Sequence, residues 1–395
     1  MTIPAGRSYL DWNATAPLRP QARDAMVQAL ECLGNPSSVH AEGRRARHLV
    51  EAARAEVAAL VGAEPAQVVF TSGGTEANHL VLGPGTAMAG DPAPRDVLLV
   101  SGIEHASAWE GGRFPEPMIE RLPVQADGRL DIEALAARLE HLAASGRTRP
   151  LVALMLANNE TGVIQPVAEA AAVVHRFGGL LHVDAVQALG RMPVDIQALG
   201  ADFLAVSAHK VGGPQGAGAV ICRGSDLLLA PPARGGGQER GRRPGTENVA
   251  AIAGFGAAAA ALRVAGTAEH NHMKNLQSRF ETGLLAAAPS TVVFGADSPR
   301  LPNTTLFAVP GGKAETALIA FDLAGVAVSS GSACSSGKVK PSHVLAAMGV
   351  PPELAGAAIR VSIGPTTTEA DLARALDAWR AYLRTLPVMS SGLAA

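Results

Sequence analysis

Hydrophobic and polar positions along the chain alternate between two patterns. Apolar residues recur at helical spacing from Ala46 to Leu60, which predicts an amphipathic helix over about residues 39–61. Helical spacing also covers 131–144 and 167–177, between short apolar runs that have the length of buried strands. This alternation predicts an α/β domain with a mainly parallel, mixed sheet between helices. The predicted strands are 68–70, 96–100, 151–156, 180–184 and 203–207.

Each of these predicted strands runs directly into a polar segment. Ligands bind at the carboxyl ends of the strands in such sheets, so we expect the polar segments to form one site. The segments are, in chain order, TSGGTEAN, SGIEHAS, ANNETG, AVQ and AHKVGGPQG.

The pattern changes after an Ala-rich helix near residues 250–265. The rest of the chain reads as short strands and helices, with a final helix from Glu369 to about Leu386, which predicts a smaller α+β domain. Neither an internal repeat nor a low-complexity linker separates the two parts. We therefore predict a large domain over 16–265 and a small domain over 266–395, to which residues 1–15 also belong.

The composition excludes several classes of function. Hydrophobic residues make up 48% and charged residues 17%, as in a folded globular protein. The net charge of −2 offers no electrostatic footprint for nucleic acid or an anionic membrane, so we expect a small-molecule substrate. Three cysteines in 395 residues do not make a disulfide framework, and their spacing suits no zinc site, so no metal is predicted. The first residues lack the apolar core of a signal peptide, and the uncharged stretch Val249–Leu262 is too short to span a bilayer, which predicts a cytoplasmic protein.

The most informative polar segments contain Asp184 and Lys210. Lys210 follows a predicted strand within Ser-x-His-Lys, where burial would lower the pKa of its amine and let it form a Schiff base. Pyridoxal phosphate needs such a lysine, an acid that keeps its pyridine nitrogen protonated, and donors for its phosphate. Asp184 ends the preceding predicted strand and could supply that acid. A helix-capping or surface lysine is the alternative at this stage.

Two neighbouring patterns bear on this hypothesis. His182 and Asp184 share one face of a strand, as in a two-residue iron motif, but no second histidine is arranged with them. In SGGTEAN, Gly73 and Gly74 let the backbone approach an anion, and Thr75 adds a hydroxyl at the start of a helix. The segment is not a P-loop, because it lacks Gly-Lys-Ser/Thr.

Cys334 lies in SSGSACSSGK (329–338), a run of small residues. An exposed cysteine in a reducing compartment invites oxidation, so its presence there favours a reactive thiol over an incidental residue on a disordered loop. Cys32 and Cys222 lie in helix-like and strand-like apolar contexts, and we expect both to pack in the core.

Together these segments resemble the cysteine desulfurases of the NifS/IscS type, in the class V aminotransferase family of fold-type I pyridoxal-phosphate enzymes. The resemblance runs from about residue 8 to residue 385, and Ser-x-His-Lys with SSGSAC is its most specific part. SSGSAC is similar to the desulfurases whose cysteine lies on a long loop, unlike the SufS-like branch. The matching segments are YLDWNATAP, GNPSSVH, VVFTSGGTEANHL, EHAS, NNETGVIQP, HVDAVQ, SAHKVGGPQG, GGGQERGRRPGTEN, SSGSAC, KPSHVL and IRVSIG.

The resemblance implies the cofactor and its ligands. Lys210 would bind pyridoxal 5'-phosphate covalently, with Asp184 at the pyridine nitrogen, Gln187 at the ring oxygen and His105 stacked on the ring. Thr246 would reach the phosphate from the partner subunit of a homodimer. The cofactor-binding residues implied in this way are Gly74, Thr75, His105, Asn159, Asp184, Gln187, Ser207, His209, Lys210 and Thr246.

The resemblance also implies the reaction. Asn159 and Arg360 would hold the carboxylate of L-cysteine, and Cys334 would attack its sulfur, leaving L-alanine and a persulfide on the enzyme. Cys334, Lys210 and His105 would be the catalytic residues. The sulfur would pass to an acceptor or iron–sulfur scaffold protein, for iron–sulfur cluster assembly or another thiolation.

Other functions remain open at this stage. A selenocysteine lyase or an aminotransferase could share the fold, although an aminotransferase would not need Cys334. A non-catalytic relative would have no reason to combine Lys210, Asp184 and His105. Two departures from the family are visible: the segment 109–117 is unlike the usual helix there, and the final SSGLAA lacks the longer tail with which some relatives contact a scaffold protein.

Overall fold

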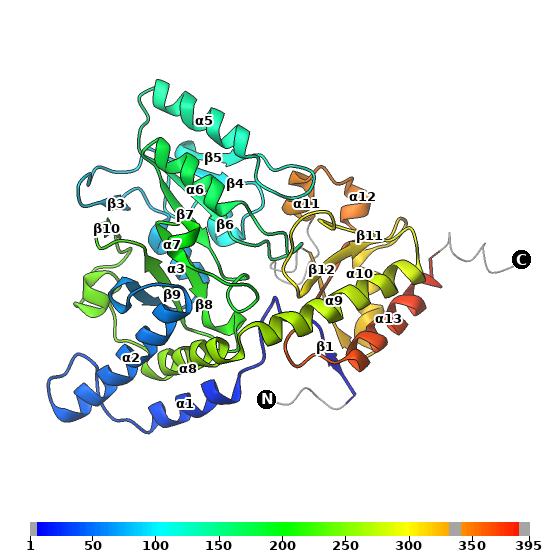
Figure 1. Ribbon diagram of the computed structural model, residues 1–395, viewed down its shortest axis with the longest axis horizontal. Coiled ribbons are helices and arrows are strands. Elements are labelled where there is room, and N and C mark those ends of the chain that lie inside the picture. The colour runs from blue at the N-terminus through cyan, green and yellow to red at the C-terminus, as the bar shows by residue number, and fades with distance from the viewer. Residues whose placement is uncertain (1–5, 332–340, 387–395) are drawn as a thin grey trace, which may run out of the picture.

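The computed structural model describes residues 6–331 and 341–386, which form two adjoining parts, each built around its own sheet (Figure 1). The larger part contains a seven-stranded sheet in the order β2-β9-β8-β7-β6-β4-β5. All of its strands run in one direction except β9, which is antiparallel to both neighbours. The strands are β2 (Val68–Thr71), β4 (Val97–Ser101), β5 (Ile119–Leu122), β6 (Pro150–Met155), β7 (Leu180–Asp184), β8 (Phe203–Ser207) and β9 (Gly218–Cys222).

The predicted α/β arrangement with a mainly parallel, mixed sheet is confirmed. Every predicted strand is present, with bounds that differ by no more than one residue from those expected. Of the other two strands, β5 was not predicted, and β9 was indicated only by the strand-like context expected for Cys222. β5 is an edge strand, so its sequence IERL carries two charges and is only partly buried. β9 has the apolar run GAVIC, a signal that could have identified it.

Both faces of the large sheet are covered by helices, which explains why its central strands β4, β6, β7 and β8 are buried at every position. Along β4, Val97 and Leu99 belong to one core cluster, whereas Leu98 and Val100 belong to another. The first cluster includes residues of α2, α5, α6 and α8, and the second includes residues of α3 and α4. These helices are α2 (Ala41–Leu60), α3 (Gly74–Val81), α4 (Ala106–Trp109), α5 (Ile132–Ala144), α6 (Val167–Arg176) and α8 (Val249–Ala265).

The Ala-rich helix α8 packs against α1 (Pro20–Leu30) and α2. Gly256 approaches α2 so closely that a Cβ there would lie 2.5 Å from Cα of Ala53, so only glycine fits. Among the described residues, no single helix is long and apolar enough to cross a membrane. α8 and α9 (Thr267–Ala287) pass that test only as a pair, which is bent by 77°.

The smaller part contains a four-stranded antiparallel sheet in the order β11-β12-β15-β14. Its core is aromatic, because the ring of Phe307 meets Phe280 and Trp379 edge-on at centroid distances of 6.0 and 5.1 Å. The predicted run VAVSS splits into two strands: β13 pairs with β1, and β14 pairs with β15. The elements are β1 (Ser8–Tyr9), α9 (Thr267–Ala287), β11 (Val292–Val293), β12 (Thr304–Ala308), α10 (Ala314–Leu323), β13 (Val326–Ala327), β14 (Ser329–Ser330), α11 (His343–Ala347), α12 (Pro352–Ala355), β15 (Ile359–Ser362) and α13 (Glu369–Leu383).

Two segments connect the parts. α8 turns into α9 at Gly266, whose φ of +54° favours glycine, and this bend lies at the predicted domain boundary. The boundaries themselves stay a prediction. The second connection is the N-terminal segment: Trp12 N–H donates to the carbonyl of Ser362, and Ala16 N–H donates to that of His209. The remaining elements are β3 (Ala87–Met88), β10 (Leu227–Leu228), α7 (Ile196–Leu199) and 3-10 turns at Pro65–Gln67, Glu116–Met118, Ala208–Lys210 and Gln238–Gly241.

Candidate active site

A cavity of about 240 Å³ lies at the carboxyl ends of β6, β7 and β8. It unites all the predicted site residues except Thr246, Arg360 and Cys334. Strand topology explains this convergence, because the ends of parallel strands meet at one edge of the sheet. The lining residues are Gly74, Thr75, His105, Ser107, Met155, Asn159, Asp184, Val186, Gln187, Ser207, His209 and Lys210.

One end of the cavity has the features of a phosphate site. Helix α3 begins at Gly74, so its first N–H groups and the Thr75 hydroxyl belong to the positive end of a helix. A Cβ at Gly74 would lie 2.8 Å from Cγ2 of Val186, so a larger residue would narrow the cavity. The buried hydroxyl of Ser207 has no hydrogen-bond partner among the described residues. An orphaned hydroxyl beside a helix N-terminus fits a phosphate group.

Asp184 is held in place by two donors. Its Oδ1 accepts from the Val186 N–H at 2.9 Å, and its Oδ2 accepts from Nδ2 of Asn78 at 2.8 Å. Oδ1 of Asn78 in turn accepts from Nε2 of His182 at 2.8 Å. Burial lowers the pKa of His182 to about 3, so the ring is neutral and serves to orient Asn78. A carboxylate fixed in this way can keep a ring nitrogen protonated.

The iron alternative finds no support in this geometry. Nε2 of His182 is engaged with Asn78, and within residues 6–331 and 341–386 no group of three or more His, Cys, Asp or Glu residues is arranged to hold a metal ion. Sequence analysis gave Asn78 no role. Its position four residues after Gly74, on the same face of α3, is the signal that could have found it.

His105 caps the short helix α4. Its Nδ1 accepts from the Ser107 N–H at 3.2 Å, and it lies 2.8 Å from the Ser107 hydroxyl. Because Nδ1 is the acceptor, a neutral His105 carries its proton on Nε2. The preceding Glu104 is buried, and burial raises the pKa of its carboxyl well above the ordinary value. The Met155 N–H donates to that carboxyl at 2.6 Å.

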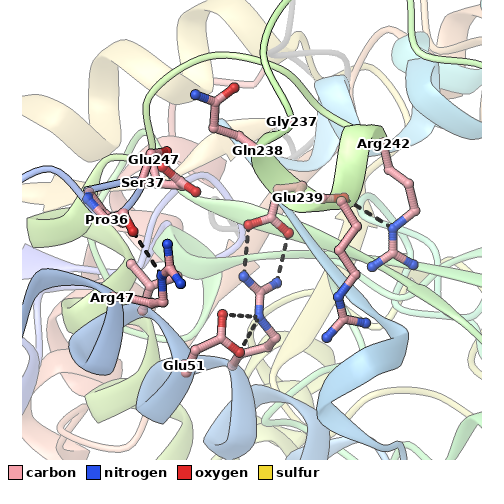
Figure 2. A pocket seen from close by; sticks show the side chains of 12 residues that line it. Pro36, Ser37, Arg47, Glu51, Gly237, Gln238, Glu239, Arg242 and Glu247 are labelled. Atoms are coloured by element: carbon pink, nitrogen blue, oxygen red, sulfur yellow. Dashed lines mark hydrogen bonds and ion pairs between the residues drawn. The ribbon is translucent and has the colours of Figure 1, made fainter. Parts of the chain in front are cut away.

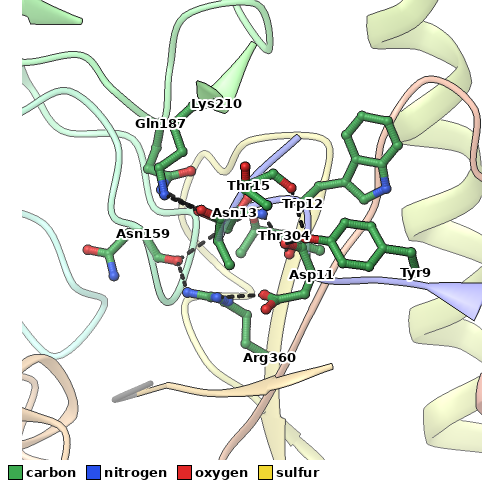
Figure 3. Close-up of polar contacts among 12 residues, drawn as sticks. Tyr9, Asp11, Trp12, Asn13, Thr15, Asn159, Gln187, Lys210, Thr304 and Arg360 are labelled. Carbon is green, nitrogen blue, oxygen red and sulfur yellow. Dashed lines mark hydrogen bonds and ion pairs between the residues drawn. The ribbon is translucent and has the colours of Figure 1, made fainter. Parts of the chain in front are cut away.

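Lys210 follows β8 in a 3-10 turn and is held by the N-terminal segment. Its Nζ donates to the carbonyls of Asn13 at 2.6 Å and Ala14 at 2.8 Å (Figure 3). Burial lowers the pKa of the neighbouring His209 to about 4, with contributions from the charges of Lys210 and Arg191. His209 is therefore neutral near pH 7 and can donate one N–H to an anion.

Asn13 links several parts of the site, although sequence analysis assigned it no role. Its carbonyl also accepts from Nε2 of Gln187 at 3.1 Å. Its side-chain Nδ2 donates to the carbonyl of Asn159 at 3.1 Å and to the hydroxyl of Thr304 at 2.9 Å (Figure 3). The Asn13 side chain therefore ties the cavity to β12 of the smaller part.

Arg360 on β15 does not line the cavity itself but contacts Asn159, which does. One guanidinium nitrogen donates to the carbonyl of Asn159 at 3.0 Å, and the other forms an ion pair with Asp11 at 2.8 Å (Figure 3). Its Nε is buried without a hydrogen-bond partner in the described part of the chain. Asn159 and Arg360, the two residues predicted to hold the substrate carboxylate, are therefore neighbours. Asn159 lines the cavity, and Arg360 is hydrogen-bonded to its backbone.

Thr246 is not in this cavity. It lines a separate cavity of about 170 Å³ with residues that include Thr71, Ser72 and Gly216. Its segment is anchored by Glu239, whose carboxylate accepts two hydrogen bonds from Arg54, at 2.7 and 2.8 Å (Figure 2).

The same Glu239 carboxylate accepts the N–H of Phe70 on β2 at 3.0 Å. Arg243 adds an ion pair with Glu76, the residue after Thr75 on α3, at 2.8 Å. Glu239 and Arg240 have positive φ angles of 48° and 59°, an unfavourable conformation for non-glycine residues that these anchors maintain. The loop before Thr246 is therefore fixed to β2 and to the first turn of α3.

Of the three cysteines, Cys334 lies outside the described residues. Cys222 is buried on β9, and burial raises the pKa of its thiol to about 11, so it is unreactive near neutral pH. The prediction that Cys32 packs in the core is wrong. Cys32 lies after the end of α1, where the chain has left the helix, and its side chain is partly exposed.

Comparison with known proteins gives consistent matches over nearly the whole chain. Residues 8–375 match the family model described as aminotransferase class-V. The chain is 44% identical to a cysteine desulfurase of Cereibacter sphaeroides, over 94% of each chain. It is 38% identical to the cysteine desulfurase IscS of Dictyoglomus turgidum, over 97% of this chain and 96% of that one. A solved structure, the NifS-like protein from Rickettsia africae, superposes with a TM-score of 0.85 at 36% identity and covers 95% of this chain and 99% of its own.

Proposed function

We infer that the chain, which belongs to the aminotransferase class-V family and within it to the cysteine desulfurases, is a pyridoxal-phosphate enzyme that removes sulfur from L-cysteine. The observation that carries this proposal is the single cavity shared by Lys210, Asp184, His105 and the orphaned hydroxyl of Ser207. These groups match the needs of the cofactor: a lysine, an acid, a proton carrier and phosphate donors.

Each side chain has a distinct place around the cofactor. Ser207, His209, Thr75 and the first N–H groups of α3 would bind the phosphate, and Asp184 would face the pyridine nitrogen. Gln187 would donate to the ring oxygen, although in this structure its amide donates to Asn13. Lys210 would supply the covalent link. When bound, pyridoxal phosphate withdraws electrons from the α-carbon of the amino acid and so makes its bonds easier to break.

The residues around the substrate handle its carboxylate and its protons. Asn159 and Arg360 would hold the carboxylate. Arg360 already forms an ion pair with Asp11, so the substrate carboxylate would either bind Arg360 together with Asp11 or displace Asp11 from it. Lys210, once displaced by the substrate, can take the proton from the α-carbon. The hydrogen bonds to Asn13 and Ala14 give its amine a fixed position for that task. His105 holds a proton on Nε2 and can pass it within the cavity.

Sulfur leaves by group transfer to Cys334. The thiolate attacks the substrate sulfur, so an S–S bond forms while the bond between the β-carbon and sulfur breaks. The electron pair of the broken bond stays with the carbon fragment, which takes up a proton and becomes alanine. L-cysteine and the enzyme thiol therefore give L-alanine and an enzyme persulfide, and no external oxidant or reductant is needed.

The same proposal includes the setting of the enzyme. We propose a homodimer in which Thr246 reaches the phosphate of the partner subunit, because its anchored loop lies beside the phosphate end but outside the cavity of its own chain. We also propose a cytoplasmic location and a protein acceptor that takes the sulfur for iron–sulfur cluster assembly or another thiolation.

The direct test is to incubate the purified, cofactor-loaded protein with L-cysteine and to measure alanine, sulfide in the presence of a thiol reductant, and sulfur bound to protein. The proposal expects equal amounts of alanine and released or bound sulfur. Lys210→Ala is the matched control and should form neither. The proposal would be contradicted if the enzyme formed pyruvate in place of alanine, or if it transferred the amino group of L-cysteine to a keto acid.

A further inference from the structure

Both flanks of the segment that carries Cys334 meet at one buried carboxyl group, that of Glu160. Residues 332–340 lie outside the described part of the chain, but Gly331 and Ser342 on either side are described. The hydroxyl of Ser342 donates a 2.6 Å hydrogen bond to Oε2 of Glu160. A Cβ at Gly331 would lie 2.8 Å from the same oxygen, so the backbone there packs tightly against it.

Glu160 belongs to the loop that also forms the substrate side of the cavity. Asn158 fixes this loop, because its Oδ1 accepts from the N–H groups of Glu160 and Thr161, both at 2.9 Å. Asn159 lines the cavity, and its carbonyl accepts from Arg360. Two consecutive residues of one constrained loop therefore serve different neighbours: Asn159 contacts the cavity, and Glu160 contacts the flanks of the Cys334 segment.

Each flank is also bound to an element of the active site. In the flank that follows the Cys334 segment, Nε2 of His343 donates to the carbonyl of Glu104 at 2.8 Å. The centroid of the His343 ring lies 4.7 Å from that of Trp109. In the flank that precedes the Cys334 segment, Ser329 of β14 pairs with Arg360 of β15. The chain thus enters the Cys334 segment beside Arg360, one of the two predicted carboxylate-binding residues, and leaves it at a point fixed to residues on either side of His105.

We propose that Glu160 is a positioning residue for sulfur transfer, whose carboxyl group fixes both flanks of the Cys334 segment relative to the substrate loop. This role rests on the proposed function. Burial raises the pKa of Glu160 to about 7, and the hydrogen bond from Ser342 and the charges of Arg360 and His105 limit the rise. An ionised carboxylate accepts a stronger hydrogen bond from Ser342 than a neutral one does.

The test compares Glu160→Ala, Glu160→Gln and the wild-type holoenzyme in a single turnover with L-cysteine. Alanine removes the shared group, whereas glutamine keeps an acceptor of the same size. We expect Glu160→Ala to gain sulfur on the Cys334 peptide at least about tenfold more slowly, and Glu160→Gln to restore most of that rate. Cofactor occupancy and the spectroscopic Kd for L-cysteine should change by less than about threefold.

Two matched controls separate positioning from general damage. The carboxylate of Glu281, like that of Glu160, accepts from a hydroxyl, that of Thr305 at 2.8 Å, so Glu281→Ala should leave persulfide formation unchanged. Ser342→Ala should slow it, because this change removes the contact with Glu160. Ser342 also caps α11, so Thr368→Ala, which removes the hydroxyl cap of α13, controls for the loss of a cap.

The outcomes are distinct. Wild-type rates of persulfide formation in both Glu160→Ala and Ser342→Ala would overturn the positioning role. A parallel loss of L-cysteine binding would overturn it too, because Glu160 would then belong to the substrate site. A wild-type protein that forms neither alanine nor persulfide would instead refute the proposed function. If Glu160→Ala does not fold, the comparison of Ser342→Ala with Thr368→Ala decides the question.

Discussion

Nζ of Lys210 lies 2.6 Å from the carbonyl oxygen of Asn13, although 197 positions separate the two residues in the sequence. This hydrogen bond brings the N-terminal segment to the amine that would bind the cofactor. The two carbonyls need two N–H donors, and a lysine nitrogen in a Schiff base has at most one. Both hydrogen bonds can therefore form only when the amine is unlinked, and together they would give Lys210 a defined position after the substrate has displaced it. The chemistry of Lys210 therefore depends on a segment that also binds the smaller part of the molecule.

Lys210→Ala should abolish the covalent attachment of pyridoxal phosphate, because Lys210 is the lysine in the cavity. Borohydride reduction followed by peptide mass spectrometry should find the adduct on Lys210 in the wild type and on no peptide of the variant. Lys274→Ala is the control, since Lys274 is exposed on α9 and should not affect labelling. An adduct on a different lysine would contradict the assignment.

Ser207→Ala should have opposite effects on the cofactor-free and cofactor-loaded protein. The buried hydroxyl has no partner among the described residues, and an unsatisfied buried polar group costs about 1–3 kcal/mol, so its removal should not destabilise the apoprotein. The same change removes a phosphate donor and should weaken cofactor binding by about tenfold. Urea unfolding of the apoprotein and titration with pyridoxal phosphate measure the two effects. A destabilised apoprotein with unchanged cofactor affinity would exclude a phosphate role for Ser207.

Cys334→Ser should keep the colour of the bound cofactor and still bind L-cysteine, yet lose turnover. Serine is nearly isosteric but almost fully protonated at neutral pH, so we expect alanine formation to fall by about a hundredfold or more, equivalent to about 2.7 kcal/mol. Wild-type enzyme exposed to L-cysteine should gain sulfur on the Cys334 peptide, and Cys32→Ser should behave like wild type. Sulfur bound to Cys32 or Cys222, or full activity of Cys334→Ser, would contradict the mechanism.

Mixed dimers should test the role of Thr246. If Thr246 binds the phosphate of the partner subunit, a heterodimer of Thr246→Ala and Lys210→Ala chains contains one site with both defects and one intact site. Mixing the two inactive or weakened homodimers under conditions of subunit exchange should therefore restore activity, up to about half of the wild-type value per dimer. Light scattering should show a dimer, and a fully active monomer would refute the shared site.

The free energy of unfolding should depend on pH through Glu160. Its pKa is raised from 4.5 to about 7 in the folded protein, so the folded state binds the proton more tightly than the unfolded state. The resulting stabilisation is complete below about pH 4.5 and is lost as the pH rises through about 7. The Glu160→Gln protein does not lose stability in this way, because glutamine does not titrate. Its stability relative to wild type should therefore increase over that range, by at most about 1.4 kcal/mol per pH unit, and level off above it.

Urea unfolding of both holoproteins at several pH values measures this difference. Taking the difference between variant and wild type cancels the titration of groups that the substitution does not affect. A difference that stays constant across the range would show that Glu160 titrates alike in the folded and unfolded states.

Much of the fold could be predicted from the sequence, because helices and buried strands leave a periodic pattern that does not depend on distant contacts. Mainly apolar runs of five or six residues marked β4, β6, β7 and β8, and the polar residues that end or follow them had to meet at one edge of the sheet. For the same reason Asp184, Ser207 and Lys210 could be assigned to one site from the order of strands and polar segments alone. The edge strand β5 was missed because charged residues interrupt its pattern.

Tertiary structure alone decided how that site is held together. Asn13 reaches Lys210, Asn78 reaches Asp184 across 106 positions, and Ser342 reaches Glu160 across 182 positions. These contacts join different elements, and their geometry depends on how whole helices and sheets pack. No local pattern encodes such a distance, because periodicity specifies which face of an element is buried and leaves open which residue it meets. The sequence by itself determined that the candidate residues follow the strands of one sheet and so share one edge of it, because strand order and polar segments can be read along the chain. Packing determined which neighbours orient those residues.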